Sequence, residues 1–352
     1  MAEQQQQQQS SSTSFSPLPP RNINKPIPIF TPLQRLPAKP SFPPPFYPQD
    51  QQPSSPTIAI GIQGAGLQKP ISMQSTVSPP RTNEELTPLI DAHILKVLED
   101  LNSEKEYTPQ IVKDLSKPTE ELAQTIDHTL LKPEATEDQI KSLCEEAVQH
   151  GFKSCCINPT HVRLVATTLS ETTKTIPCSV IGFPLGTSST SSKCYESSLA
   201  ILDGAKEIDM VIPIGHLLSK NYSYVYNDIL SVVRATKGLP VKVIIETSLV
   251  KTQEEKIAAC WIAAEAGAMW VKTSTGFSGG GATVEDVRLM RLAVAHKEGV
   301  KVKASGGVRN FEQAINMIKA GASRIGTSNG VAIMADQEKK EASGSEKKEE
   351  SY

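Results

Sequence analysis

The chain has 352 residues, of which 38% are hydrophobic, and its formal net charge is -2. A charge so close to balance creates no overall field that would attract nucleic acid or an anionic membrane surface. No run of eighteen apolar residues occurs, so no segment is predicted to span a membrane.

The six cysteines form no CxxC pair, and no secretory leader is recognisable. This pattern predicts reduced thiols in a cytoplasmic protein.

Residues 1–80 differ in composition from the rest of the chain. They hold 17 of the 26 prolines and the run Gln4–Gln9, but only two acidic residues, Glu3 and Asp50. Such a segment buries too little apolar surface to offset the entropy lost on ordering, so we predict disorder. Its shortage of acidic residues is also a feature of organelle transit peptides. It lacks their early arginines, so a plain extension is favoured while targeting stays open.

Residues 81–121 are predicted to form a helical lead-in that covers one end of the following domain. Thr82 and Glu85 match a capping box at the start of a helix over 82–101. Thr108-Pro109 and Pro118-Thr119-Glu120 are typical of two further, short helix starts.

Residues 122–335 alternate between short apolar runs and helical patterns, several of which end at glycine. The runs are mostly continuous, as in parallel strands buried on both faces. Eight such units predict a (β/α)8 barrel; an open doubly wound sheet is the alternative, although no GxGxxG loop follows the first strand. The predicted strands are 125–131, 154–158, 178–183, 207–212, 241–246, 269–272, 301–304 and 323–326.

Residues 336–352 are highly charged and hold no apolar residue larger than Ala342 until Tyr352. We predict a solvated, flexible tail.

Reactive side chains in such a barrel project from the C-terminal ends of the strands. Polar or reactive residues at these ends are Asp127, Cys156, Asp209, Glu246, Lys272 and Lys303.

Two lysines, Lys272 and Lys303, each end a strand just before a Ser/Gly loop. A free lysine has a pKa of about 10.4 and is a poor nucleophile at neutral pH. A second ammonium at ~4 Å would contribute about 4 kcal/mol and bring one amine to a pKa near ~7–8. We therefore expect Lys272 to attack carbonyl groups and Asp209 to move the protons.

The loops containing Gly306-Gly307 and Gly326–Gly330 follow the seventh and eighth strands. Their backbone N–H groups can form a phosphate nest, which indicates a small phosphorylated substrate.

The same residues also fit purely structural roles. Asp127 and Asp209 could cap strands or form ion pairs, Glu246 could anchor the barrel interior, and Cys156 could be a small buried hydrophobe. The six histidines show no metal-ligand spacing, so we expect neither a metal nor another cofactor.

Four segments closely resemble the class I deoxyribose-phosphate aldolase family, over about residues 120–335. They are Ile126–Pro133 (IDHTLLKP), Ile208–Ile212 (IDMVI), Val271–Phe277 (VKTSTGF) and Val302–Arg309 (VKASGGVR).

The resemblance implies reversible cleavage of 2-deoxy-D-ribose 5-phosphate to D-glyceraldehyde 3-phosphate and acetaldehyde, in deoxyribonucleoside catabolism and without a metal. Lys272 matches the imine-forming lysine, Lys303 the second lysine, Asp209 the proton shuttle and Asp127 a supporting aspartate. Cys156 matches a cysteine at the aldehyde site. Some members have lysine in place of Phe277, a charge that Arg309 could supply. The phosphate-binding positions match Gly276, Gly306, Gly307, Gly326, Ser328 and Asn329.

Some members of the family end in a tyrosine that enters the site and assists proton transfer. Tyr352 is the corresponding residue here, and a coincidental match is an equally good explanation of its position. The alternatives to this function are another imine-forming phosphosugar aldolase and an inactive barrel scaffold. A homodimer is the expected assembly, although no segment marks an interface.

Overall fold

The computed structural model describes residues 81–104, 107–169 and 174–335. The predictions of disorder for 1–80, of a flexible tail for 336–352 and of a role for Tyr352 lie outside the described residues. None of the helices in the described ranges is long and apolar enough to cross a membrane.

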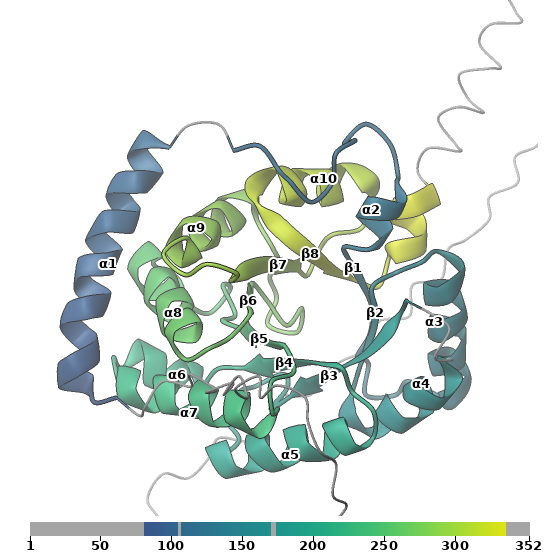
Figure 1. The fold of residues 1–352 in the computed structure, drawn as a ribbon, viewed down its shortest axis with the longest axis horizontal. Helices are drawn as coiled ribbons and strands as arrows, with labels where there is room; N and C mark the ends of the chain where they lie inside the picture. Colours follow the sequence, from purple (N-terminus) through teal and green to yellow (C-terminus); the bar gives the residue numbers. More distant parts are fainter. Residues whose placement is uncertain (1–80, 105–106, 170–173, 336–352) are drawn as a thin grey trace, which may run out of the picture. The chain divides into compact units, whose positions relative to one another are not determined.

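Eight parallel strands close into a barrel in which each strand pairs with the next and β8 pairs with β1 (Figure 1). This closure confirms the (β/α)8 prediction and excludes the open sheet. The strands are β1 (Ile126–Leu130), β2 (Ser154–Ile157), β3 (Ile176–Ile181), β4 (Glu207–Val211), β5 (Val241–Ile244), β6 (Trp270–Lys272), β7 (Lys301–Ser305) and β8 (Ala322–Thr327).

Helices surround the barrel and pack on the outward faces of its strands (Figure 1). Outward side chains such as Ile208, Met210 and Val243 are fully buried in the apolar core beneath them. The helices are α3 (Glu137–Gln149), α4 (Val162–Thr168), α5 (Thr190–Leu202), α6 (Ile214–Leu218), α7 (Tyr222–Ala235), α8 (Gln253–Glu265), α9 (Val284–Val294) and α10 (Phe311–Ala320), with a 3-10 turn, η1 (Pro159–His161), before α4.

Local capping sets where several helices begin. The Thr136 side chain accepts a hydrogen bond from the Gln139 N–H, and the Gln139 side chain accepts one from the Thr136 N–H. This reciprocal pair satisfies two of the otherwise unpaired N–H groups at the start of α3. The same motif at Thr82 and Glu85 opens α1 (Asn83–Ser103), as predicted.

The lead-in is partly different from the prediction. Helix α1 lies along the side of the barrel against α7, α8 and α9, not over one end (Figure 1). Helix α2 (Glu120–Ala123) forms as expected and leads into β1, but no helix begins at Thr108-Pro109 in the described residues 107–119. Asp114 and Glu121 there bind backbone N–H groups of Ser116 and Lys113, which favours irregular turns over a helix.

Helix α1 covers the outer face of α8, which is why α8 is buried on nearly all sides. Apolar contacts from Leu86, Ile90 and Val97 are joined by a 2.8 Å hydrogen bond between the His93 ring and the Ala293 carbonyl of α9. The lead-in is therefore an integral part of the folded unit.

This packing gives a test with a matched control on the same helix. Ile90→Ala should lower the free energy of unfolding by about 2–4 kcal/mol, because a fully buried side chain leaves a cavity. Leu95→Ala removes a side chain that is 71% exposed, and should change it by less than about 0.5 kcal/mol. Urea denaturation measures both; equal effects would show that α1 does not pack as described.

Candidate active site

The interior of the barrel is charged, although its strands look apolar in sequence. Alternate residues of a strand face opposite sides of a sheet, and this periodicity brings charged side chains from six strands to the barrel axis. Asp127 comes from β1, Glu207 and Asp209 from β4, Lys242 from β5, Lys272 from β6, Lys303 from β7 and Arg324 from β8. All of them are buried.

The carboxylate of Asp209 is the centre of this cluster. Its Oδ2 atom accepts hydrogen bonds from Lys272 Nζ at 2.8 Å and Lys303 Nζ at 2.7 Å. Its Oδ1 atom accepts from Lys242 Nζ at 2.7 Å and from the thiol of Cys178 at 3.2 Å. The structure thus brings Asp209, Lys272 and Lys303 together, as the sequence predicted.

Asp127 forms a second carboxylate in contact with the same cations. Its Oδ2 atom lies 2.5 Å from Lys303 Nζ, and its Oδ1 atom accepts hydrogen bonds from Ser154 and Arg324, each at 2.7 Å. Lys303 therefore lies between two carboxylates, which holds its ammonium group in one place.

The pKa values in the cluster follow from these contacts. Burial alone would lower the pKa of Lys303, but the carboxylates of Asp127 and Asp209 outweigh it and raise that pKa. Burial alone would raise the pKa of Asp209, but the ammonium groups of Lys242, Lys272 and Lys303 hold it well below the usual range. Both groups therefore keep their charge at neutral pH.

The cluster contains four cationic side chains but only three carboxylates, Asp127, Glu207 and Asp209. Burying an unpaired charge is costly. Of these cations only Lys272 forms a single ion pair and also lines the pocket described next.

A pocket of 640 Å³ opens above Lys272 at the C-terminal ends of the strands. Every glycine, serine, asparagine and arginine predicted to bind phosphate lines it: Gly276, Gly306, Gly307, Arg309, Gly326, Ser328 and Asn329. Lys272 itself is 3% exposed, so its amine is at the floor. Asp127, Asp209 and Lys303 are fully buried below it.

At two positions around this pocket, neighbouring atoms come so close to the backbone that only glycine fits. A Cβ atom on Gly281 would lie 2.4 Å from the Gly306 carbonyl oxygen, so these two loops can pack together only without a side chain there. A Cβ atom on Gly326 would lie 2.2 Å from Ser305 Oγ and 2.9 Å from Lys303 Cε. Gly326 therefore leaves the space that the Lys303 side chain occupies.

Cys156 and Glu246 are placed differently from the other predicted residues. Cys156 is fully buried beside Leu131, Cys178 and Val180 and does not line the pocket. Glu246 follows β5 and accepts hydrogen bonds from the N–H and the hydroxyl of Thr275. It thereby holds the loop after β6, which fits its alternative role as an anchor.

Sequence analysis missed five residues of the site: Glu207, Lys242, Arg324, Cys178 and Lys132. The first three are charged residues at inward positions of otherwise apolar strands, and that spacing was a usable signal. Lys132 lines the pocket from the loop after β1. Nothing in the sequence marked Cys178 as a site residue, because a cysteine in an apolar strand is usually a small hydrophobic core residue.

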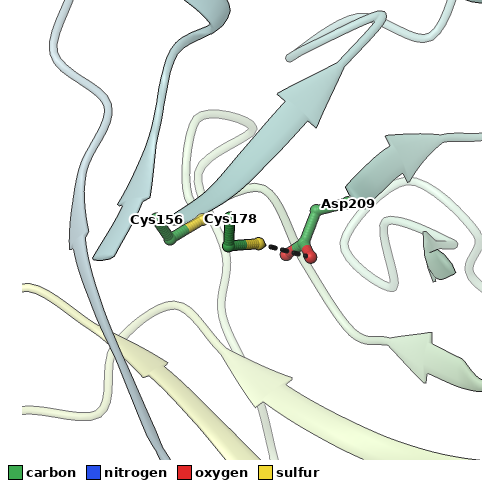
Figure 2. A group of neighbouring side chains, drawn as sticks. All are labelled: Cys156, Cys178 and Asp209. Carbon is green, nitrogen blue, oxygen red and sulfur yellow. Dashed lines mark hydrogen bonds between the residues drawn. The ribbon is translucent and has the colours of Figure 1, made fainter. Parts of the chain in front are cut away.

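The donor atoms of Cys156, Cys178 and Asp209 lie within 4.8 Å of one another, a spacing that could suit a metal (Figure 2). The charges around them do not. Lys242 Nζ lies 2.7 Å from Asp209 Oδ1 and 3.2 Å from Cys178 Sγ, where a cation would have to bind. A divalent cation would be repelled by this ammonium, so the group fits a metal poorly.

Arg324 tests the charge balance of the cluster. Arg324→Met removes one of the cationic partners of both Asp127 and Glu207 and should lower the free energy of unfolding by about 3–5 kcal/mol. Arg309→Met is the matched control at an exposed arginine, with a change within about 0.5 kcal/mol in urea denaturation. An Arg324 variant as stable as the control would show that the carboxylates do not depend on it.

Comparisons with known proteins agree with this geometry. A family profile described as DeoC/LacD family aldolase matches residues 122–336. The deoxyribose-phosphate aldolase of Halalkalibacterium halodurans is 57% identical over 214 residues, covering 60% of this chain and 94% of that protein. The enzyme of the same name from Thermococcus kodakarensis is 54% identical over 217 residues, covering 61% and 96%.

Solved structures show the same relationship. A candidate deoxyribose-phosphate aldolase from Coccidioides immitis is 39% identical, with a TM-score of 0.65, and the match covers 73% of this chain and 98% of that one. The tetrameric deoxyribose phosphate aldolase from Aeropyrum pernix is 31% identical, with a TM-score of 0.59 and coverage of 70% and 97%. The chain belongs to the DeoC/LacD aldolase family.

Proposed function

We propose that this protein catalyses the reversible cleavage of 2-deoxy-D-ribose 5-phosphate to D-glyceraldehyde 3-phosphate and acetaldehyde, through an imine on Lys272. The observation that carries the proposal is the position of Lys272. Its amine is at the floor of the pocket, 2.8 Å from Asp209, and Asp209 also contacts Lys303. The reaction belongs to the breakdown of deoxyribonucleosides.

Lys272 begins the reaction by adding to the C1 aldehyde of the open-chain sugar. The resulting carbinolamine loses water when a proton reaches its hydroxyl group, and Asp209 with Lys303 forms the nearest proton-transfer pair. The expectation that the Lys303 ammonium activates the Lys272 amine stays a prediction; the contact of both with one carboxylate oxygen supports it.

The protonated imine then withdraws electrons from the sugar chain. The bond that breaks is C2–C3, because two carbons remain on the lysine as an enamine and three leave as glyceraldehyde 3-phosphate. A base removes the proton of the C3 hydroxyl as this bond breaks; we assign Asp209, directly or through water. Protonation of the enamine at C2 and hydrolysis release acetaldehyde.

The outer part of the pocket supports a phosphate site. Its glycine-rich loops carry Gly276, Gly306 and Gly307 in left-handed backbone conformations, of the kind from which successive N–H groups build an anion-binding nest. Arg309 and Lys132 are the cationic side chains that line the pocket besides Lys272. They offer the positive charge that Phe277 does not.

Steady-state kinetics with 2-deoxy-D-ribose 5-phosphate test the catalytic assignment. Lys272→Arg should lower kcat by at least about four orders of magnitude, because it removes the nucleophile. Lys303→Met should lower it by about two to four orders, because it removes one proton-transfer partner. Lys251→Arg, at an exposed lysine outside the barrel interior, is the control and should match the wild type. An active Lys272→Arg enzyme would refute the assignment.

The phosphate assignment has its own kinetic signature. Arg309→Met should raise KM for 2-deoxy-D-ribose 5-phosphate by about ten-fold or more, because an ion pair to phosphate is lost. Its kcat/KM for unphosphorylated 2-deoxy-D-ribose should stay within about two-fold of the wild-type value. Equal losses with both sugars would mean that Arg309 supports the fold of the loop and not phosphate binding.

Assembly and location are further parts of this proposal. A homodimer or larger homo-oligomer is supported by the tetramer named for the Aeropyrum pernix relative, and light scattering of the purified protein tests it. A cytoplasmic location is supported by six cysteines that are all free thiols.

A further inference from the structure

Two cysteines lie side by side next to the catalytic carboxylate, and the proposed reaction uses neither sulfur as a nucleophile. Cys156 in β2 is the register partner of Cys178 in the neighbouring parallel strand β3. Both side chains are fully buried and point to the same side of the sheet, toward Asp209 (Figure 2). Their sulfur atoms lie within 4.8 Å of each other and of a carboxylate oxygen of Asp209.

This arrangement fits the geometry that a disulfide requires. Neighbouring strands are about 4.7–4.9 Å apart, and disulfides join Cα atoms about 4.4–6.8 Å apart. A small rotation of each side chain therefore brings the two sulfurs into bonding distance without a break in the sheet.

The single proton of Cys178 has two acceptors within reach. It is donated to Asp209 Oδ1 at 3.2 Å, and the Cys156 sulfur is also a hydrogen-bond partner of Cys178. The hydrogen bond with Cys178 lowers the pKa of Cys156, and the ammonium groups of Lys303 and Lys272 act in the same direction against burial. Burial raises the pKa of Cys178 well above its usual value. Cys156 is thus the more acidic thiol of the pair and the one that more readily forms a thiolate.

We propose that Cys156 and Cys178 form an oxidation site, in which hydrogen peroxide converts the two thiols to a disulfide and reversibly inactivates the enzyme. The Cys156 thiolate attacks one peroxide oxygen, the O–O bond breaks, and the leaving hydroxide takes up a proton to become water. The Cys178 sulfur then attacks the sulfenic sulfur, the S–O bond breaks, and the second water leaves with the Cys178 proton. Two thiols and one peroxide give one disulfide and two waters.

The disulfide acts on catalysis through Asp209. It removes the S–H group that donates to Oδ1, so Lys242 is the remaining donor to this oxygen. The loss of one hydrogen bond to a charged group corresponds to a fall in rate of about ten- to a hundred-fold. Both thiols are fully buried, so an oxidant must be small and neutral to reach them. Hydrogen peroxide meets this condition, and a bulky disulfide such as oxidised glutathione does not.

The test is peptide mapping of the full-length protein after treatment with hydrogen peroxide, in parallel with activity. We expect a cross-linked pair of peptides joining Cys156 to Cys178, an activity loss of about ten-fold or more, and recovery of both by dithiothreitol. Oxidised glutathione should give neither. Free Cys156 and Cys178 in fully treated protein, or sulfinic acid on Cys156 without a cross-link, would overturn the proposal.

Variants separate this pair from the other neighbouring thiols, Cys144 and Cys155, which are hydrogen-bonded to each other. Cys144→Ser should leave the cross-link and the loss of activity intact. Cys178→Ser should abolish the reversible loss, measured against its own untreated rate. If Cys178→Ser does not fold, mapping of the wild type decides the matter. The activity readout rests on the proposed function, but the mass readout needs no substrate, so the two can fail separately.

Discussion

The site depends on one carboxylate buried among ammonium groups. Asp209 accepts hydrogen bonds from three lysines, and each of these lysines would be costly to bury without it. Asp127 and Glu207 form the remaining ion pairs, with Lys303, Lys242 and Arg324. The cluster still contains one cation more than it has carboxylates. Lys272 is the cation of the cluster that lines the pocket.

The barrel makes this arrangement stable because it fixes all six strands that contribute to it. Neighbouring strands are held in register by backbone hydrogen bonds. Lys272 therefore lies opposite Lys303 on the next strand, and Asp209 lies opposite Lys242. Close packing then fixes the side chains: Gly326 leaves room for Lys303, and Glu246 holds the loop that follows Lys272. The apolar helices outside keep water from the charges. Helix α1 extends this outer layer by covering α8.

The fold and the central residues were largely predictable from sequence. Apolar runs separated by glycine-ended helical patterns identified all eight strands. Asp209, Lys272 and Lys303 were predicted at strand ends; Lys272 does end β6, but Asp209 and Lys303 are the middle residues of β4 and β7. The position of α1 was not predictable, because its apolar face at Leu86, Ile90 and Val97 shows that it packs but not on which surface.

The rest of the site was missed for a different reason. Lys242 and Arg324 are single charges inside apolar strands, and each has a meaning only through partners on other strands. Sequence proximity does not show that Lys242 meets Asp209, or that Arg324 meets Asp127 and Glu207. Cys178 likewise becomes informative only when the register places it beside Cys156.

Borohydride reduction of the protein in the presence of acetaldehyde, followed by peptide mapping, tests the central claim most directly. The account predicts one stable ethyl adduct, on Lys272, with Lys242 and Lys303 unmodified because both are held as buried ammonium groups. An adduct on Lys303 or Lys242, or no adduct in folded protein, would contradict the assignment of Lys272 as the imine-forming residue.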